Sequence, residues 1–124
     1  GAAAGAVETA SNPGAEAQRA MRELHRVTRR DGTLLLSVPY GARSNRGWFR
    51  ILDEEELGLL TGVPGWTPTS TRFFRAFREG WREVGAAAAA DAGYNEPPNR
   101  PGRQTAPPYV AAAEAGALVE MRRD

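Results

Sequence analysis

The chain has no cysteine and no lysine, and large aliphatic side chains are scarce among its 124 residues. Without cysteine, disulfides, thiolate nucleophiles and cysteine-bound zinc are excluded. No apolar run approaches the roughly 20 residues that a membrane-spanning helix needs. The small apolar residues 1–6 also lack the basic flank and bulky hydrophobic stretch of a signal peptide. We therefore expect no membrane partner and a cytoplasmic location.

The scarcity of aliphatic residues predicts an underfilled core. Leu, Ile, Val and Phe together account for 21 residues, whereas alanine alone accounts for 22. A low aliphatic share would indicate disorder if it came with a high net charge, but the formal net charge is only +1. The composition therefore favours one piece of a larger domain, or a domain that depends on a partner.

All sixteen basic residues are arginines, and fifteen acidic residues nearly balance them. Balanced charge creates no net field that would attract nucleic acid, so nucleic acid is not the expected partner. The single histidine and the scattered carboxylates match no metal-ligand spacing, so no metal is expected. His25 lies beside an apolar helix stripe and is expected to have a helix-surface or packing role rather than to act as a general base.

The first half of the chain predicts a helix, a turn and a strand. Residues 1–12 are expected to be disordered or a linker, although Asn12-Pro13 already has the form of a helix start. Apolar side chains then recur at helical spacing to about Thr28. Asp31-Gly32 favours a turn. Thr33–Val38 is so apolar that it predicts a central strand covered on both faces, the usual state of a parallel strand in an α/β sheet.

A second helix is predicted to begin after Asp53. Asp53 and Glu56 have the spacing of a capping box, and Leu52 with Leu57 has the spacing of a hydrophobic staple. Gly62 is expected to end the helix. This geometry explains the acidic run Asp53–Glu56 without any metal or acid–base chemistry.

The second half of the chain predicts two strands with a helix between them. Thr69–Arg78 alternates as a strand does, and its arginines suit a sheet edge. Trp81–Ala92 is rich in alanine and predicts a helix. The five prolines of Tyr94–Pro108 indicate an irregular segment, and Ala117–Arg122 alternates again and predicts the last strand.

The order of these elements resembles the second half of the class I, S-adenosylmethionine-dependent methyltransferases of small-molecule type. RAMRELHRVTRRDGTLLLSVPYG is similar to the helix, turn and fifth strand of that family. GWFRILDEEELGLL resembles the helix before the sixth strand, TRFFRAFREGW the sixth strand, and ALVEMRR the final antiparallel strand. The resemblance implies an α/β fold, a partial Rossmann-like methyltransferase sheet with parallel strands plus a final antiparallel strand and flanking helices. Residues 13–124 would then be the C-terminal portion of a methyltransferase-like domain.

The resemblance implies S-adenosylmethionine as the methyl donor. Family members hold the donor with a glycine-rich turn after the first strand and an acidic residue at the end of the second strand. Neither feature precedes residue 13 here, so no donor-binding residue is carried over and no catalytic residue is identified. We expect the isolated chain neither to bind the donor well nor to be active.

The same resemblance leaves the leucine-rich strand with an open edge where a fourth strand would lie. Such an edge invites pairing with another chain. The expected protein partner is a second copy or a complementary N-terminal half.

The glycine-punctuated loop Pro39–Arg50 is the candidate site for the methyl acceptor, because it leaves the carboxyl end of a strand, where open α/β sheets bind ligands. Tyr40 would donate a hydrogen bond, and Trp48 would close a hydrophobic wall over the acceptor. An arginine would hold an anionic group by a bidentate contact. In the alternative interpretation the loop aromatics anchor it to the following helix and the arginines are solvated. The candidate residues are Tyr40, Arg43, Trp48 and Arg50, with Arg46 as a further possible arginine.

Three functions remain open from the sequence. The first is methyl transfer to a small-molecule acceptor within an intact enzyme. The second is a non-catalytic interaction module that binds a partner chain through the open sheet edge and the arginine-rich helix. The third and weakest is nucleic-acid binding through the arginines and phenylalanines of Thr71–Phe77, a pattern that can grip phosphates and stack bases.

Overall fold

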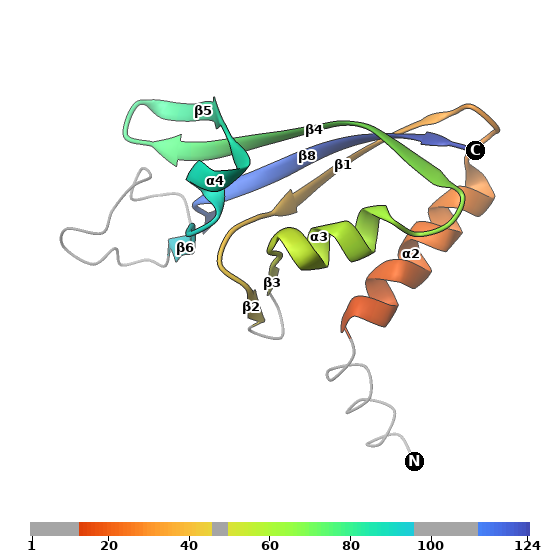
Figure 1. Cartoon of the computed structure of the whole chain (residues 1–124), viewed down its shortest axis with the longest axis horizontal. Coiled ribbons are helices and arrows are strands. Elements are labelled where there is room, and N and C mark those ends of the chain that lie inside the picture. The colour runs from red at the N-terminus through yellow and green to blue at the C-terminus, as the bar shows by residue number, and fades with distance from the viewer. Residues whose placement is uncertain (1–12, 46–49, 96–111) are drawn as a thin grey trace, which may run out of the picture.

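A computed structural model describes residues 13–45, 50–95 and 112–124. A long twisted sheet lies over two helices (Figure 1). The helices are α2 (Pro13–Val27), α3 (Glu54–Thr61) and the short α4 (Ala86–Ala89). The main sheet has the order β1-β8-β4-β5, with β1 at Thr33–Pro39, β8 at Ala115–Arg123, β4 at Trp66–Phe77 and β5 at Gly80–Val84. Two short pairs complete the described structure: β2 (Ser44–Asn45) with β3 (Arg50–Ile51), and β6 (Tyr94–Asn95) with β7 (Ala112–Ala113).

The strand pairing corrects the predicted fold class. β8 runs antiparallel to both β1 and β4, and β5 runs antiparallel to β4. The partial Rossmann-like sheet of parallel strands is therefore wrong, because the main sheet is antiparallel throughout. β1 and β4 do point in the same direction, but the last strand of the chain lies between them and takes the hydrogen bonds of both.

The leucine-rich strand is an edge strand, not the predicted central strand covered on both faces. Successive side chains of a strand point to opposite faces. Leu34 and Leu36 therefore pack against the core, while Leu35 on the other face is 63% exposed. The apolar run predicted a strand correctly, but it could not show that only one face would be covered.

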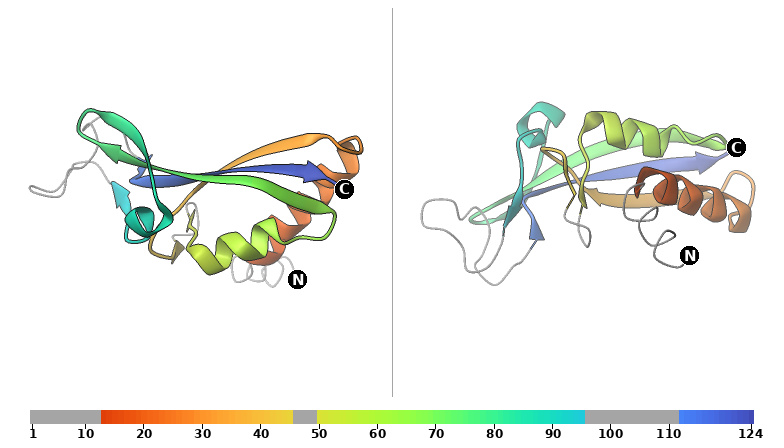
Figure 2. Two further views of the ribbon diagram at one scale, coloured as in Figure 1. Left: turned by 45° about the horizontal axis from the view of Figure 1, so that its top comes forward. Right: turned by 90° about the horizontal axis from the view of Figure 1, so that it is seen from below.

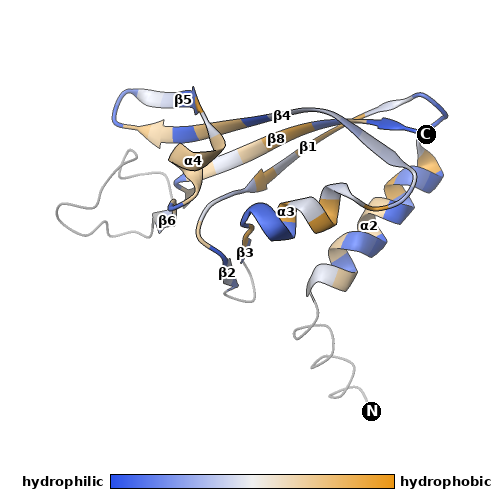
Figure 3. Ribbon diagram, in the orientation of Figure 1, coloured by the Kyte–Doolittle hydropathy of each residue, from blue (hydrophilic) through white to orange (hydrophobic). Residues whose placement is uncertain are grey.

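That covered face carries both α2 and α3, as the two rotated views show (Figure 2). Figure 3 shows hydrophobic bands alternating with hydrophilic ones along α2, as expected for a helix that packs on one side only. The centre of the core comes from β8, where Val119 and Met121 are fully buried. Alanines fill much of the remainder, in agreement with the scarcity of large aliphatic residues. They are Ala89, Ala92, Ala115 and Ala117.

The first helix follows its prediction closely, since α2 ends one residue short of Thr28. Trp66, at the start of β4, donates its indole N–H to the carbonyl oxygen of Met21 at 3.0 Å. The ring of His25 meets the Trp66 ring edge-on, with 5.7 Å between the centroids. The expected packing role of His25 is confirmed. Glu23 forms an exposed ion pair with Arg26, three residues further along the helix.

Both strands predicted in the second half of the chain are present, one of them with a corrected position in the sheet, and the helix predicted between them is wrong in part. β8 begins two residues before the predicted last strand and extends one residue beyond it. β4 is not a sheet edge, because β8 and β5 flank it. The predicted helix Trp81–Ala92 is wrong over its first half, because Gly80 adopts a φ of 134° and the chain turns back to pair with β4. The alanines form only the single turn of α4.

The expectation for residues 1–12, and most of that for Tyr94–Pro108, lies outside the described residues. In the part of the chain that is described, no helix combines the length and apolar character required to cross a membrane.

Candidate functional site

Backbone hydrogen bonds hold both ends of the predicted acceptor loop beside the end of β1. Leu52 donates its N–H to the Pro39 carbonyl at 3.0 Å, and Gly41 donates to the Leu52 carbonyl at 2.9 Å. Gly41 has a φ of 155°, and a Cβ there would lie 2.2 Å from the Ala92 carbonyl oxygen. Only glycine fits at this close approach, since any side chain would displace neighbouring backbone.

Tyr40 belongs to the protein core rather than to an open surface. Its side chain is 3% exposed, and its ring lies 4.7 Å from the Phe73 ring, centroid to centroid, at 59°. Burial raises the pKa of the Tyr40 phenol, and the negative charges of Glu54 and Asp53 raise it further. The phenol is therefore neutral at physiological pH and is held rigidly at the carboxyl end of β1.

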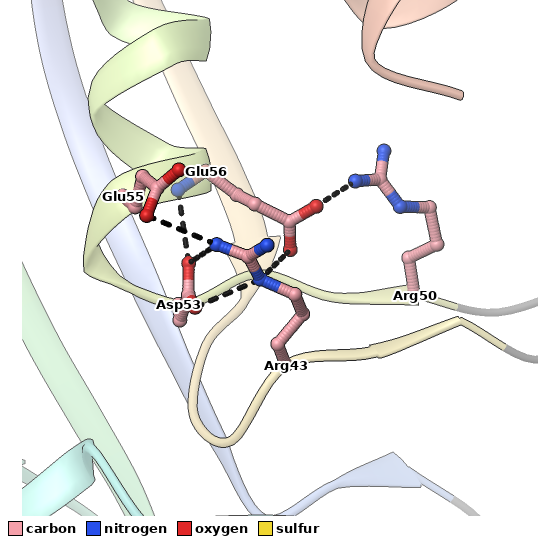
Figure 4. A network of polar contacts seen from close by, with 5 residues as sticks. All are labelled: Arg43, Arg50, Asp53, Glu55 and Glu56. Carbon is pink, nitrogen blue, oxygen red and sulfur yellow. Dashed lines mark hydrogen bonds and ion pairs between the residues drawn. The ribbon is translucent and has the colours of Figure 1, made fainter. Parts of the chain in front are cut away.

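Arg43 is tied to the first turn of α3 (Figure 4). Its Nε donates to Oδ2 of Asp53 at 2.9 Å, and its Nη2 donates to Oδ1 at 3.2 Å. The same Oδ1 accepts the backbone N–H of Glu56 at 2.9 Å, so Asp53 caps the helix as predicted. The pKa of Asp53 is lowered, first by the hydrogen bond from Arg43 and then by the bond from the Glu56 backbone.

Arg50 contacts the same first turn of α3 through Glu56. Its Nη2 lies 2.5 Å from Oε2 of Glu56, while Oε1 of Glu56 lies 3.6 Å from Nε of Arg43. That Oε1 is buried and has no hydrogen bond to any described residue. Glu55 adds a longer contact to Arg43 at 3.5 Å. The structure thus brings two of the predicted residues together over a common carboxylate.

We call these five residues the loop–helix cluster: Arg43, Arg50, Asp53, Glu55 and Glu56. Both arginines were among the predicted site residues, but their carboxylate partners were not. The available signal was that Arg43 and Arg50 precede carboxylates by ten and six residues. The arginines are paired rather than merely solvated, and an anionic ligand would have to compete with Asp53 for Arg43. Trp48 and Arg46 lie outside the described residues.

The arginines of the Thr71–Phe77 segment are also engaged by the protein's own groups. Arg72 binds Glu83 through two hydrogen bonds and lies over the Phe74 ring. Arg75 donates to the carboxylate of Asp91 and to the Ala88 carbonyl, both at 2.7 Å. These contacts leave fewer donors for phosphate and do not favour nucleic-acid binding. Within the described ranges, no three His, Cys, Asp or Glu side chains converge where a metal ion could bind.

The outer edge of β1 is a second candidate site. A backbone hydrogen bond marks each end of the β1–β8 pairing. At one end Tyr40 donates its N–H to the Ala115 carbonyl, and at the other Arg123 donates its N–H to the Gly32 carbonyl. Bonded positions alternate along an antiparallel pair. The even-numbered residues of β1 therefore face β8, and Thr33, Leu35 and Ser37 direct their N–H and C=O groups away from it.

No described residue forms a backbone hydrogen bond with these three outward-facing positions. All three side chains are exposed. We call Thr33, Leu35 and Ser37 the open edge.

No family model, curated protein or solved structure matches the chain.

Proposed function

We propose that this chain is the C-terminal part of an S-adenosylmethionine-dependent methyltransferase that acts on a small-molecule acceptor. What supports the proposal is the order of its elements. The segments similar to the family occur along the chain in the order α2, β1, α3, β4 and β8, with shorter elements between some of them. The last strand, β8, runs antiparallel to both β1 and β4, between which it lies. Because the expected sheet type was wrong, the support comes from this order and direction and not from the class of sheet.

In this proposal the acceptor binds beside the carboxyl end of β1, over the loop–helix cluster. Methyl transfer needs little more than alignment of donor and acceptor. The buried ring of Tyr40 supplies a rigid floor, and Arg43 and Arg50 fix the loop against α3. Arg43 is therefore a positioning residue.

Charge around the loop–helix cluster favours a neutral or cationic acceptor. Among the described residues, the two positive charges of Arg43 and Arg50 contact three carboxylates, Asp53, Glu55 and Glu56, and the adjacent Glu54 adds a fourth negative charge nearby. The resulting excess of negative charge would repel an anionic acceptor. The proposed compartment is the cytoplasm, which agrees with the absence of cysteine.

Titration calorimetry with S-adenosylmethionine tests the donor side of the proposal. The chain alone should bind the donor weakly or not at all, because it lacks the glycine-rich turn and the acidic strand end. The longest natural polypeptide that contains the chain should bind it. Tight binding by the 124-residue chain alone would show that the donor site has been assigned to the wrong part of the protein.

The acceptor side is tested by turnover in that longer polypeptide. Arg43→Ala should lower turnover by releasing the loop, and Tyr40→Phe should lower it by removing the hydroxyl group from the floor of the proposed site. Arg72→Ala is the matched control, because Arg72 is also paired with a carboxylate but lies on the sheet. Turnover that is unchanged in both loop variants would contradict an acceptor site at this loop.

A second candidate function is a non-catalytic interaction module that pairs through the open edge. The observation that favours it is the row of outward N–H and C=O groups at Thr33, Leu35 and Ser37. Amide hydrogen exchange tests it, since these three amides should exchange rapidly in the monomeric chain and become protected when a partner strand adds. Equal exchange with and without a bound partner would exclude this edge as the binding surface.

A further inference from the structure

Building on the second candidate function, we propose that the open edge pairs with a second copy of the same chain. The two β1 strands would run antiparallel about a two-fold axis at Leu35. The main sheets of the two copies would then join into one continuous antiparallel sheet.

The alternation of β1 fixes the register of this contact. Placing Leu35 opposite Leu35 of the second copy puts Thr33 opposite Ser37, and Ser37 opposite Thr33. Each hydrogen-bonded pair of an antiparallel ladder exchanges two bonds, so every outward N–H and C=O of the open edge finds a partner. Shifting the register by two residues toward Pro39 loses a donor, because proline has no N–H. The Pro39 carbonyl is in any case occupied by Leu52.

β1 lacks the features that normally protect an edge strand. Such strands are blunted by charged side chains, internal prolines or bulges. The sequence of β1 carries no charge, and its proline is the last residue. The irregularity in the main sheet falls between Pro68 and Ser70 of β4, not in β1.

The opposite edge of the sheet differs in this respect. β5 is shorter than β1 and carries Arg82 and Glu83. Charged side chains on an edge oppose further pairing. The contrast between the two edges selects β1 as the contact strand.

A second copy suits the open edge chemically because β1 is self-complementary. The two-fold axis places leucine opposite leucine and threonine opposite serine, so no like charges face each other. Leu35, now 63% exposed, would be covered by its symmetry mate on the face that the helices leave open. Side chains directly opposite have Cβ atoms roughly 4.5–5.5 Å apart, close enough for that contact.

Light scattering and sedimentation of the full chain test the dimer. The expected mass is twice 13.4 kDa. Leu35→Pro removes an outward N–H but no bond to β8, so the monomer should keep its fold while the symmetric contact loses two bonds. The dissociation constant should rise about tenfold or more, given the net stabilisation of each bond. Leu35→Thr is the matched control, since it keeps the N–H and should still dimerise.

Disulfide trapping provides a second measurement that does not depend on the proline variant folding. The chain has no cysteine, so Leu35→Cys introduces a single thiol at the two-fold axis. Mild oxidation should convert it to a covalent dimer. Trp81→Cys, at a similarly exposed position on β5, should not react in this way (Trp81 is 53% exposed).

Three outcomes would overturn the proposal. They are a monomer at all concentrations, equal cross-linking of the two cysteine variants, and a Leu35→Pro dimer as tight as the original. A labelled peptide with the sequence of β1 separates the proposal from the broader edge-pairing function. Binding of the peptide by a monomeric chain would reject the second copy as partner and retain the edge as a site for another strand, whereas no binding would reject both.

Discussion

The guanidinium of Arg43 binds both carboxylate oxygens of Asp53, the residue that caps α3. Asp53 therefore has two partners, the helix backbone at Glu56 and the loop at Arg43. This double contact fixes the loop after β1 relative to the helix that covers the sheet. The geometry of the proposed acceptor site depends on it.

Substitution of Asp53 should separate these two contacts. Asn keeps an oxygen that can cap the helix but loses the charge that binds Arg43, whereas Ala loses both. The melting temperature should fall in the order wild type, Asp53→Asn, Asp53→Ala. A double-mutant cycle with Arg43→Ala isolates the Arg43 contribution. Identical melting of all the variants would mean that the cluster does not stabilise the fold.

Stability should fall in acid. The pKa values of Asp53, Glu83 and Asp91 are lowered, in each case mainly by a hydrogen bond from an arginine. A carboxylate whose pKa is lower in the folded state stabilises the fold at pH values above its unfolded-state pKa. This stabilisation is lost as the pH falls through the folded-state pKa. The loss should therefore begin near the ordinary values of 3.8 and 4.5 and continue below them.

Urea unfolding across this pH range measures the acid effect. Because the three carboxylates are at the surface, added salt should reduce it. A free energy of unfolding that stays constant from neutral pH to about pH 3 would contradict the role of these ion pairs.

The phenol of Tyr40 should titrate above the ordinary pKa of a tyrosine. Its pKa is raised by burial first and by neighbouring carboxylates second, so its neutral form adds stability below the unfolded pKa of about 10. That stability is lost as pH rises through the higher folded value. Phenolate absorbance should show a late phase that Tyr40→Phe removes. If the phase persists in Tyr40→Phe, it belongs to another tyrosine.

The local elements of this chain could be predicted because their signals are local. The cap at Asp53 and the stop at Gly62 depend on residues within a few positions of one another. The alternation of β8 likewise marks a strand with one buried face. Each of these predictions agrees with the described structure.

Strand pairing could not be predicted because it depends on contacts between distant residues. Nothing in the leucine-rich strand indicates that it pairs along one edge with β8, which follows about eighty residues later in the chain. Trp81–Val84 reads as part of a helix until the turn at Gly80 brings it against β4. The partners of Arg43 and Arg50 were missed for the same reason, since only the fold brings these arginines to the carboxylates of Asp53 and Glu56.

The centre of the core should be sensitive to loss of volume. Met121 is fully buried beneath the helices. Met121→Ala should cost about 2–5 kcal/mol, since the cavity is only partly filled by relaxation. Met121→Leu conserves volume and should cost less than about 1.5 kcal/mol. Chemical denaturation of the two variants measures both values, and equal losses would mean that this part of the core is not tightly packed.

The hydrogen bond between Trp66 in β4 and Met21 in α2 should contribute less to the free energy of unfolding than the buried side chain of Met121 does. Trp66→Phe keeps an aromatic ring in the core but removes the hydrogen bond to the Met21 carbonyl. The net loss should be about 0.5–1.5 kcal/mol, the usual contribution of one intramolecular hydrogen bond. Chemical denaturation gives the free energy of unfolding, and amide exchange in α2 shows whether the loss is local. The loss of stability could instead be several times larger, with the α2 amides still as well protected as those of the rest of the chain. In that case ring packing against His25 contributes more to stability than the hydrogen bond does.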